Sequence, residues 1–181
     1  RALTFRNGRT TELKSRNDKN FNDKFYPVYD AVKSWNIKAV IDGEIVVVDE
    51  KGISRFNKLQ NWRSEADGIL QYYVFDVLWY NGKSLTGLPL SERMQVLKAI
   101  VPKENDTIRL GFSVTGRGKE FFNTAQQMGL EGVMAKRLDS PYLPGDRSRD
   151  WLKIKVHKRQ EVIIVGYTKN EGSPKLFSSL L

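Results

Sequence analysis

Apolar residues recur along the chain at two spacings, every second residue in some segments and every third or fourth in others. The first spacing predicts β-strands and the second predicts α-helices. Strand patterns, several rich in β-branched residues or bordered by Asn-Gly turns, cover residues 3–5, 12–15, 39–48, 70–80, 108–114, 132–137 and 151–156. Helical patterns begin at Pro27, near residue 54, at Ser91 and at Lys119, and the last ends at Gly129.

The turn signals between neighbouring strand patterns favour antiparallel pairing over a regular parallel βαβ series. We therefore predict an α+β fold in which antiparallel sheets are flanked by helices. The polar residues 157–160 indicate a junction, and residues 161–168 predict one more strand beyond it. Because the last segment is too short to form a domain alone, we expect one domain over 1–159 and the start of a second, truncated domain over 160–181.

Composition narrows the class of protein. The chain has 181 residues, of which 40% are hydrophobic, so it can bury a core, and it contains no Cys. These values exclude a disulfide scaffold and a disordered chain, and the lack of Cys fits a reducing compartment. No window approaches the ~18 consecutive apolar residues of a membrane helix, so we expect a soluble protein. The chain has a single His, so a zinc site could have at most one His ligand.

The net charge of +9 is concentrated in two blocks. Residues 1–24 hold seven basic and three acidic residues, and residues 136–159 hold eight basic and three acidic residues. The rest of the chain is balanced. Localised basic charge indicates a polyanionic partner, such as nucleic acid or nucleotide phosphates, although two solvated basic faces would give the same count.

Several candidate side chains lie on the predicted strands. Alternation places Asp42 and Glu44 on one face, with Gly43 leaving room for a ligand or another backbone to come close. Two acids on a strand are also typical of a solvated edge. Phe75 comes late in an apolar strand, where a core position is the commoner use of an aromatic ring and stacking on a base the rarer one.

The second basic block contains amines that suit phosphate chemistry. Lys153 and Lys155 share one face of the strand 151–156, where an anion would relieve their repulsion, although an open basic strand face is an alternative. Glu131 and Lys136 bracket the preceding strand, and the carboxylate suits a Mg²⁺ that also binds substrate phosphates. Strict alternation from Glu131 would place Lys136 on the opposite face. No phosphate-binding loop of the Gly-x-x-x-x-Gly-Lys type is present.

Five of these short segments, in this order, resemble motifs of the covalent nucleotidyltransferases, which comprise ATP-dependent DNA ligases and the related RNA ligases and capping enzymes. The segments resemble motifs Ia, III, IIIa, IV and V, and they are residues 15–17, 42–44, 75–76, 131–136 and 151–155. The chain is most similar to the ligase domain of bacterial end-joining ligase D, through residues 142–148 and 161–167. The resemblance implies an ATP-grasp-like fold, with the first strand of an oligonucleotide-binding (OB) domain after residue 160.

The resemblance also implies a role for each motif residue. Glu44 would accept a hydrogen bond from a ribose hydroxyl of ATP, and Phe75 would stack on adenine. Glu131 would bind Mg²⁺ or Mn²⁺. Lys153 and Lys155 would be catalytic residues that contact the α-phosphate and stabilise charge as pyrophosphate leaves. Lys136 would lie near the nucleotide and Arg16 near the 5′-phosphate of a DNA break.

Arg1 is similar to the last residue of motif I, Lys-x-Asp-Gly-x-Arg, and would contribute to the nucleotide site. The nucleophilic lysine of that motif would then lie upstream of Arg1. We therefore expect the 181-residue chain not to form lysyl-AMP by itself.

As a relative of ligase D, the parent protein would seal breaks in double-stranded DNA during bacterial non-homologous end joining, a pathway of DNA repair and recombination. Expected partners are broken DNA, a Ku-type end-binding protein, and polymerase and phosphoesterase modules, all in the bacterial cytoplasm at the nucleoid. Two alternatives remain. One is an RNA ligase or a capping-type enzyme, and the other is a fragment that binds nucleotide or DNA without catalysis.

Overall fold

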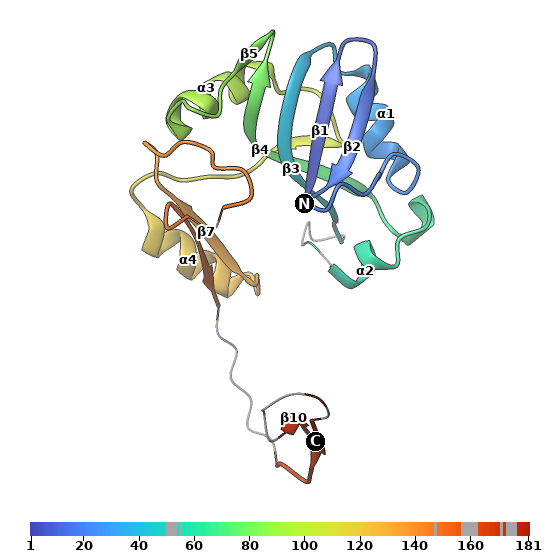
Figure 1. Ribbon diagram of the computed structural model, residues 1–181, viewed down its shortest axis with the longest axis vertical. Coiled ribbons are helices and arrows are strands. Elements are labelled where there is room, and N and C mark those ends of the chain that lie inside the picture. Colours follow the sequence, from blue (N-terminus) through green and yellow to red (C-terminus); the bar gives the residue numbers. More distant parts are fainter. Residues whose placement is uncertain (50–53, 55, 147, 157–162, 171, 173–176) are drawn as a thin grey trace.

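The computed structural model places the expected helices and strands into two sheets and a terminal hairpin (Figure 1). It describes residues 1–49, 54, 56–146, 148–156, 163–170, 172 and 177–181. The junction expected at 157–160, and with it the proposed domain boundary, lies outside the described residues. No helix in the described part of the chain is both long and apolar enough to cross a bilayer.

The main sheet has the strand order β2-β1-β3-β4-β5, with β6 paired to β4. Its strands are β1 (Ala2–Asn7), β2 (Thr11–Ser15), β3 (Lys38–Val47), β4 (Leu70–Tyr80), β5 (Lys83–Ser84) and β6 (Ile108–Leu110). The hairpins expected at the two Asn-Gly turns are both present, since β1 pairs with β2 and β4 with β5. Asn81 and Gly82 both have positive φ, as a tight turn requires.

The main sheet departs from the expectation in one strand. β6 covers three residues, fewer than the 108–114 predicted, and it runs parallel to β4. The helix α3 (Leu90–Ile100) lies between the two strands in sequence, so β4, α3 and β6 form a crossover of the kind that parallel pairing needs. The fold is a mixed α+β fold, but the sheet is not purely antiparallel.

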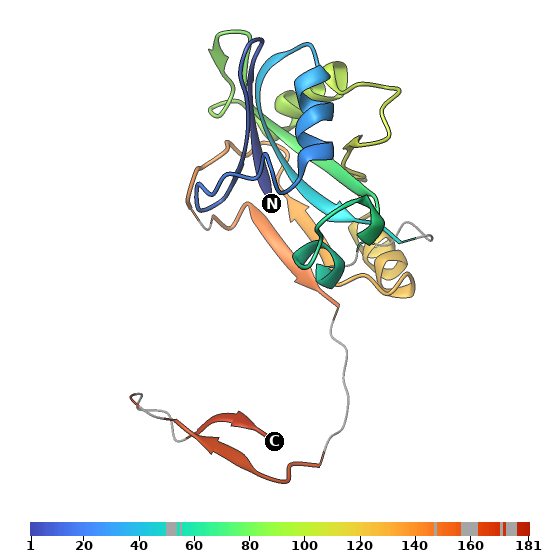
Figure 2. The ribbon, with the colours of Figure 1, turned by 90° about the vertical axis from the view of Figure 1, so that its right-hand side faces the viewer.

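One face of the main sheet packs on the hydrophobic core. The helix α1 (Tyr26–Ser34) begins with Pro27 in its first turn and buries Val28 and Val32 against that face (Figure 2). Leu97 of α3 and Ile108 of β6 belong to the same cluster. The opposite face of β3 and β4 carries Glu44 and Phe75 outside the core.

A short helix, α2 (Phe56–Gln60), and one turn of 3₁₀-helix at Glu65–Asp67 connect β3 to β4. The helix confirms the helical pattern predicted near residue 54. Trp62 lies between them and is buried, with its indole N–H donating to the carbonyl of Gly68 at 2.9 Å. This connection therefore folds back onto the edge of the core.

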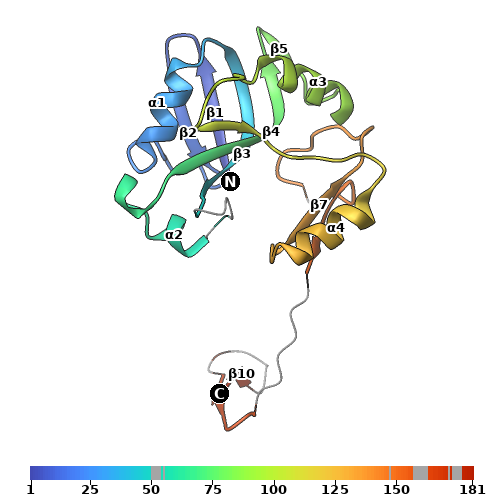
Figure 3. The same cartoon turned by 180° about the vertical axis from the view of Figure 1, so that it is seen from behind.

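A second, two-stranded sheet lies beside the main one. It is formed by β7 (Gly132–Lys136) and β8 (Trp151–Lys155), and α4 (Gly118–Gln127) packs on β7 (Figure 3). The loop 137–150 between the two strands returns to the start of α3 and the turn before it, where three backbone hydrogen bonds hold it. They are Tyr142 N–H to Thr86 O, Leu90 N–H to Ser140 O and Ser91 N–H to Leu138 O, at 2.8–3.0 Å.

The C-terminal residues form a hairpin of β9 (Tyr167–Lys169) and β10 (Phe177–Leu180). Among the described strands these two pair only with each other, and Figure 2 shows them apart from the rest of the chain. The strand expected over 161–168 is therefore shorter and later than predicted. Residues 161 and 162 lie outside the described part, and residues 163–166 are not in a strand.

Candidate functional site

The site is built around a β-bulge in β4. Asp42 of β3 is opposite Asp76, but the next residue, Gly43, is opposite Val74, so Phe75 is the extra residue on β4. A bulge re-aims the side chains beside it. The ring of Phe75 thereby points away from the core and is only partly buried, with its centroid 6.2 Å from that of Trp151 on β8.

Two carboxylates lie side by side next to the bulge. Asp42 and Asp76 are cross-strand partners, and both are completely buried. Buried carboxylates are costly unless they are paired, and each of these has its own arginine. Arg1 Nε donates to Asp42 at 2.9 Å, and Arg93 of α3 donates to both oxygens of Asp76 at 2.8 and 2.9 Å. The site thus contains two neighbouring ion pairs.

Tyr142, from the loop 137–150, closes the first of these ion pairs. Its hydroxyl donates to Asp42 Oδ2 at 2.9 Å and accepts from Arg1 Nη2 at 3.0 Å. Burial, followed by the charge of Asp42, raises the pKa of the Tyr142 hydroxyl. The hydrogen bond to Asp42 likewise raises the pKa of the Arg1 guanidinium. Arg1 and Tyr142 therefore keep their protons at neutral pH, and the loop is tied to β3.

The space above Gly43 is filled by the protein itself. A Cβ at this position would lie 2.5 Å from the Tyr72 ring and 2.7 Å from the carbonyl oxygen of Tyr73. The Tyr72 hydroxyl is buried and accepts from Thr4 Oγ1 at 3.1 Å. Gly43 was expected to leave room for a ligand or for another backbone, and the structure shows that other protein atoms occupy this space.

Lys136 reaches the bulge from the second sheet. Its amine lies 4.3 Å from the centroid of the Phe75 ring and 3.8 Å from that of Trp151. Both distances are typical of cation–π contacts. Burial lowers the pKa of this amine to about 8, so a fraction of it is neutral near physiological pH. No carboxylate among the described residues forms an ion pair with it.

The pairing of β7 with β8 puts the predicted basic residues on one face. Met134 is opposite Lys153, Lys136 is opposite Trp151, and Lys155 is opposite Gly132. The predicted alternation along β8 is therefore confirmed, and Lys136 lies on the same face as Lys153 and Lys155.

Glu131 also reaches this face, contrary to strict alternation. Gly132 has φ +151°, a backbone conformation open mainly to glycine, and it interrupts the alternation at the start of β7. The Glu131 carboxylate accepts a hydrogen bond from Lys153 Nζ at 3.1 Å. The Glu131 side chain is 80% exposed and that of Lys153 52% exposed, so this pair is accessible to solvent.

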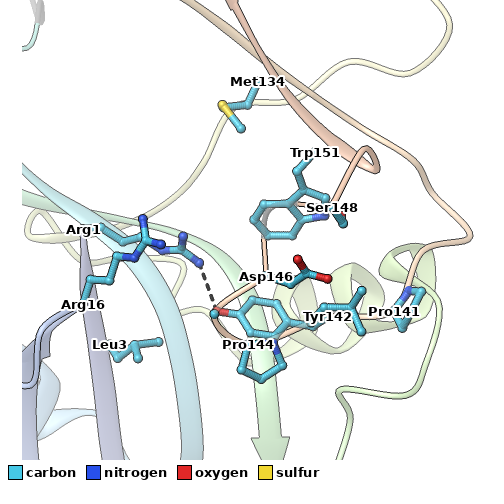
Figure 4. A pocket seen from close by; sticks show the side chains of 12 residues that line it. Arg1, Leu3, Arg16, Met134, Pro141, Tyr142, Pro144, Asp146, Ser148 and Trp151 are labelled. Carbon is cyan, nitrogen blue, oxygen red and sulfur yellow. Dashed lines mark hydrogen bonds between the residues drawn. The ribbon is translucent and has the colours of Figure 1, made fainter. Parts of the chain in front are cut away.

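A cavity of about 560 Å³ lies between Arg1 and the loop 137–150 (Figure 4). In Figure 4, Arg1 and Arg16 lie on one side and Tyr142 and Trp151 on the other. The cavity is lined by Arg1, Leu3, Arg16, Met134, Pro141, Tyr142, Leu143, Pro144, Gly145, Asp146, Ser148 and Trp151. Its two guanidinium groups and two aromatic rings suit a ligand that is both planar and anionic.

The structure brings some of the predicted residues together and leaves others apart. Phe75 and Lys136 are in direct contact, and Arg1 lies 5.7 Å from the Phe75 ring. Arg16 is exposed, and it is related to Arg1 only because both side chains line the cavity. Glu44 is exposed on β3 opposite Tyr73, and Lys155 is exposed on β8.

Arg93 was absent from the sequence expectations. It lies at helical spacing with the buried Leu90 and Leu97, so an arginine on the apolar face of α3 was the available signal. The importance of Tyr142 could be read only from the fold, because its partner Asp42 is 100 residues away in sequence.

The chain is similar to known proteins in both sequence and structure. Residues 1–155 match a family model described as the ATP dependent DNA ligase domain. The multifunctional non-homologous end joining protein LigD of Pseudomonas aeruginosa is 38% identical over 151 residues, which is 82% of this chain and 17% of LigD. The chain thus spans about a sixth of that relative.

Solved structures of ligase D are similar to the chain, and two of them illustrate this. The ligase domain of LigD from Mycobacterium tuberculosis superposes with a TM-score of 0.73 at 30% identity, covering 85% of this chain and 50% of that domain. A mycobacterial DNA ligase D complexed with ATP and MES gives a TM-score of 0.76 at 31% identity, covering 92% of this chain and 55% of the other.

Proposed function

This chain belongs to the ATP-dependent DNA ligase family, as an adenylation domain similar to that of LigD, and from that premise we propose that its parent protein seals breaks in double-stranded DNA. The observation that carries the proposal is the bulge at Phe75. It presents an aromatic ring to a face that also carries Arg1, Lys136 and Trp151. The joining reaction would run through lysyl-AMP and DNA-adenylate, with AMP passed to a 5′-phosphate and then displaced by a 3′-hydroxyl.

We propose that three side chains bind the adenosine part of the nucleotide, each through a different contact. Phe75 stacks on adenine, with the Lys136 amine beside the base, and Glu44 accepts a hydrogen bond from the ribose. The support is that Phe75 and Glu44 lie on the face of β3 and β4 opposite the core, and that Lys136 of β7 contacts the Phe75 ring. Stacking of a base on an aromatic ring contributes about 1–3 kcal/mol, so Phe75 would supply a large part of the affinity.

Lys153 and Lys155 are proposed to contact the α-phosphate. They extend from the face of β8 that also carries Trp151, and both are exposed and able to reach a bound nucleotide. Fixed positive charge at this place would stabilise the charge that develops as the bond to pyrophosphate breaks. Arg1 would hold the nucleotide from the opposite side, and Arg16 would contact the 5′-phosphate of the DNA break.

Glu131 is the proposed protein ligand for Mg²⁺ or Mn²⁺. The described residues contain no group of three His, Cys, Asp or Glu side chains that could hold an ion by themselves. One exposed carboxylate fits Mg²⁺, which keeps several waters and completes its shell with substrate phosphates. When bound, the ion would supply charge neutralisation at the phosphate oxygens.

None of the lysines at this site is proposed as the nucleophile. Lys136 is held between two rings and Lys153 is paired with Glu131. An attacking amine must instead be aimed at the α-phosphorus. We therefore propose that the nucleophile is the lysine of motif I, five positions before Arg1, and that the 181-residue chain does not self-adenylate. Incubation with labelled ATP and Mg²⁺, followed by a denaturing gel, tests this, and a covalent band would contradict it.

Non-covalent binding of ATP to the 181-residue chain tests the proposed site. We expect ATP to quench the fluorescence of Trp151, because that ring lines the site, and we expect GTP to compete poorly. Phe75→Leu and Lys153→Ala should each weaken ATP binding. Lys83→Ala, which removes an exposed amine on β5, is the matched control and should leave binding unchanged. Equal affinity for ATP in all three variants would reject the assignment.

The wider role is proposed on the similarity to LigD alone. The curated relative is described as a multifunctional non-homologous end joining protein. We propose that this chain likewise acts on broken DNA, together with a Ku-type end-binding protein and with polymerase and phosphoesterase modules. We also propose that residues 160–181 begin an OB domain, which the β9–β10 hairpin is consistent with.

A further inference from the structure

We propose that Arg93 is a positioning residue for the nucleotide site, holding the β4 bulge in the geometry that presents Phe75. The inference rests on the proposed function, because Phe75 is the ring on which adenine is proposed to stack. Arg93 itself does not touch that ring. It acts through Asp76 and through the loop 137–150.

The first step is a two-point contact between Arg93 and Asp76. Nε donates to Oδ1 at 2.8 Å and Nη2 donates to Oδ2 at 2.9 Å, and both side chains are completely buried. The planar guanidinium fixes the plane of the carboxylate as well as its distance. Asp76 therefore has one orientation in the core.

The second step connects Asp76 to the bulge. Asp76 directly follows Phe75, and its Oδ1 also accepts from the backbone N–H of Val77 at 2.9 Å. The carboxylate that Arg93 orients is thus bonded to the main chain at Val77, which lies between the bulge at Phe75 and a second register shift at Leu78. Because a bulge is held only by the bonds on either side of it, this contact fixes the direction of the Phe75 side chain.

The third step uses the remaining nitrogen. Arg93 Nη1 donates to the carbonyl oxygens of Leu88 and Ser140, the second at 3.1 Å. Ser140 lies two residues before Tyr142, and the guanidinium lies 5.9 Å from the centre of the Tyr142 ring. One buried arginine therefore holds both the bulge and the loop that contacts Arg1.

A lysine at position 93 would keep the positive charge but could not bond both oxygens of Asp76 and the two carbonyls in one plane. Arg93→Lys should therefore loosen the bulge without leaving an unpaired carboxylate. The variant would lose binding free energy from the part of the ligand that stacks on Phe75. Phosphates, which are proposed to contact the lysines of β8, would be bound as before.

The experiment compares ATP with tripolyphosphate, which has the phosphates but no base, as ligands of the 181-residue chain. Arg93→Lys should weaken ATP binding at least about fivefold, the lower end of what base stacking supplies, and leave tripolyphosphate binding unchanged. In a chain that already carries Phe75→Leu, Arg93→Lys should have little further effect, because both changes remove the same contact.

Leu97→Ala is the matched control. Leu97 lies one turn along the same helix and is fully buried in the hydrophobic core, and its aliphatic side chain cannot hydrogen-bond to Asp76. Its truncation lowers stability without reaching the bulge, so ATP and tripolyphosphate should bind with an unchanged ratio. If Arg93→Lys does not fold, Asp76→Asn takes its place, since it sets an amide group against Arg93 at the same volume, and the same pattern is expected.

Three results would overturn the positioning role. The first is unchanged ATP binding by Arg93→Lys. The second is an equal loss of affinity for ATP and for tripolyphosphate in that variant, and the third is the same ATP-specific loss of affinity in Leu97→Ala. A different result, failure of the unsubstituted chain to bind ATP, would reject the proposed function itself.

Discussion

Lys136 shows how strongly its surroundings alter a single side chain. Its amine rests against the rings of Phe75 and Trp151, and burial lowers its pKa to about 8 from 10.5. Between these two values the unfolded chain binds more protons than the folded chain. The free energy of unfolding contributed by this residue must therefore rise as pH increases.

Urea unfolding of the chain and of Lys136→Met at several values from about pH 7.5 to about pH 9.5 measures this contribution. The difference in free energy of unfolding, chain minus variant, should increase with pH, because the charged amine is the form that burial disfavours. Other titrating groups cancel in the difference. A difference that stays flat across this range would show that the amine is not desolvated.

At the scale of elements, the packing of β3 on β4 depends on Gly43. A methyl group there would meet the Tyr72 ring at 2.5 Å and the Tyr73 carbonyl at 2.7 Å, and both belong to the neighbouring strand. Gly43→Ala should therefore lower the free energy of unfolding by about 1–3 kcal/mol, the usual cost of overpacking a core. Thermal unfolding measures it.

Gly87→Ala is the control for that prediction. Gly87 is exposed, has no positive φ, and has no atom within 4 Å of the place where its Cβ would lie. The same chemical change should there be neutral or slightly stabilising, because alanine restricts the unfolded chain. Equal losses of stability at the two positions would mean that contact with Tyr72 is not the cause.

The elements were largely predictable from local patterns. The hairpin turns, the β-branched run of β3 and the proline at the start of α1 each depend on residues adjacent in sequence. The parallel pairing of β6 with β4 was not predicted, because it depends on how α3 packs and no local pattern records that. The strand over 161–168 was placed too early for a similar reason, since its partner lies at the end of the chain.

The candidate site divides in the same way. The motif residues could be singled out as candidates because each motif is a short run of sequence. The bulge at Phe75 and the pairing of Asp42 with Tyr142 were not, since both depend on residues brought together by the sheet. The apparent conflict between Glu131 and Lys136 was resolved only by the backbone conformation of Gly132.

At the scale of the whole molecule, the two basic blocks flank one cavity. Arg1 and Arg16 come from the first block and the loop 137–150 from the second. If DNA is the ligand, the logarithm of its binding constant should fall linearly with the logarithm of the salt concentration, because binding releases counterions. Arg16→Ala should reduce that slope by about 1, the amount expected for one phosphate contact.

Titration of labelled nicked DNA at several salt concentrations measures the slope. Arg109→Ala is the matched control, because Arg109 is an exposed arginine already paired with Asp106 at 3.0 Å. It removes the same formal charge away from the cavity and should leave the slope unchanged. An equal change of slope in both variants would show that net charge, and not the position of Arg16, governs binding.

The loop 137–150 also has a mechanical consequence. A β-hairpin under tension normally unzips from one end, and β7 and β8 are joined at Lys136 and Trp151 only through this loop. The loop is bonded to Thr86 and to Leu90 and Ser91 of α3, and to β3 of the main sheet through Tyr142. Force applied across the second sheet is therefore carried into the first, and the two sheets should unfold together.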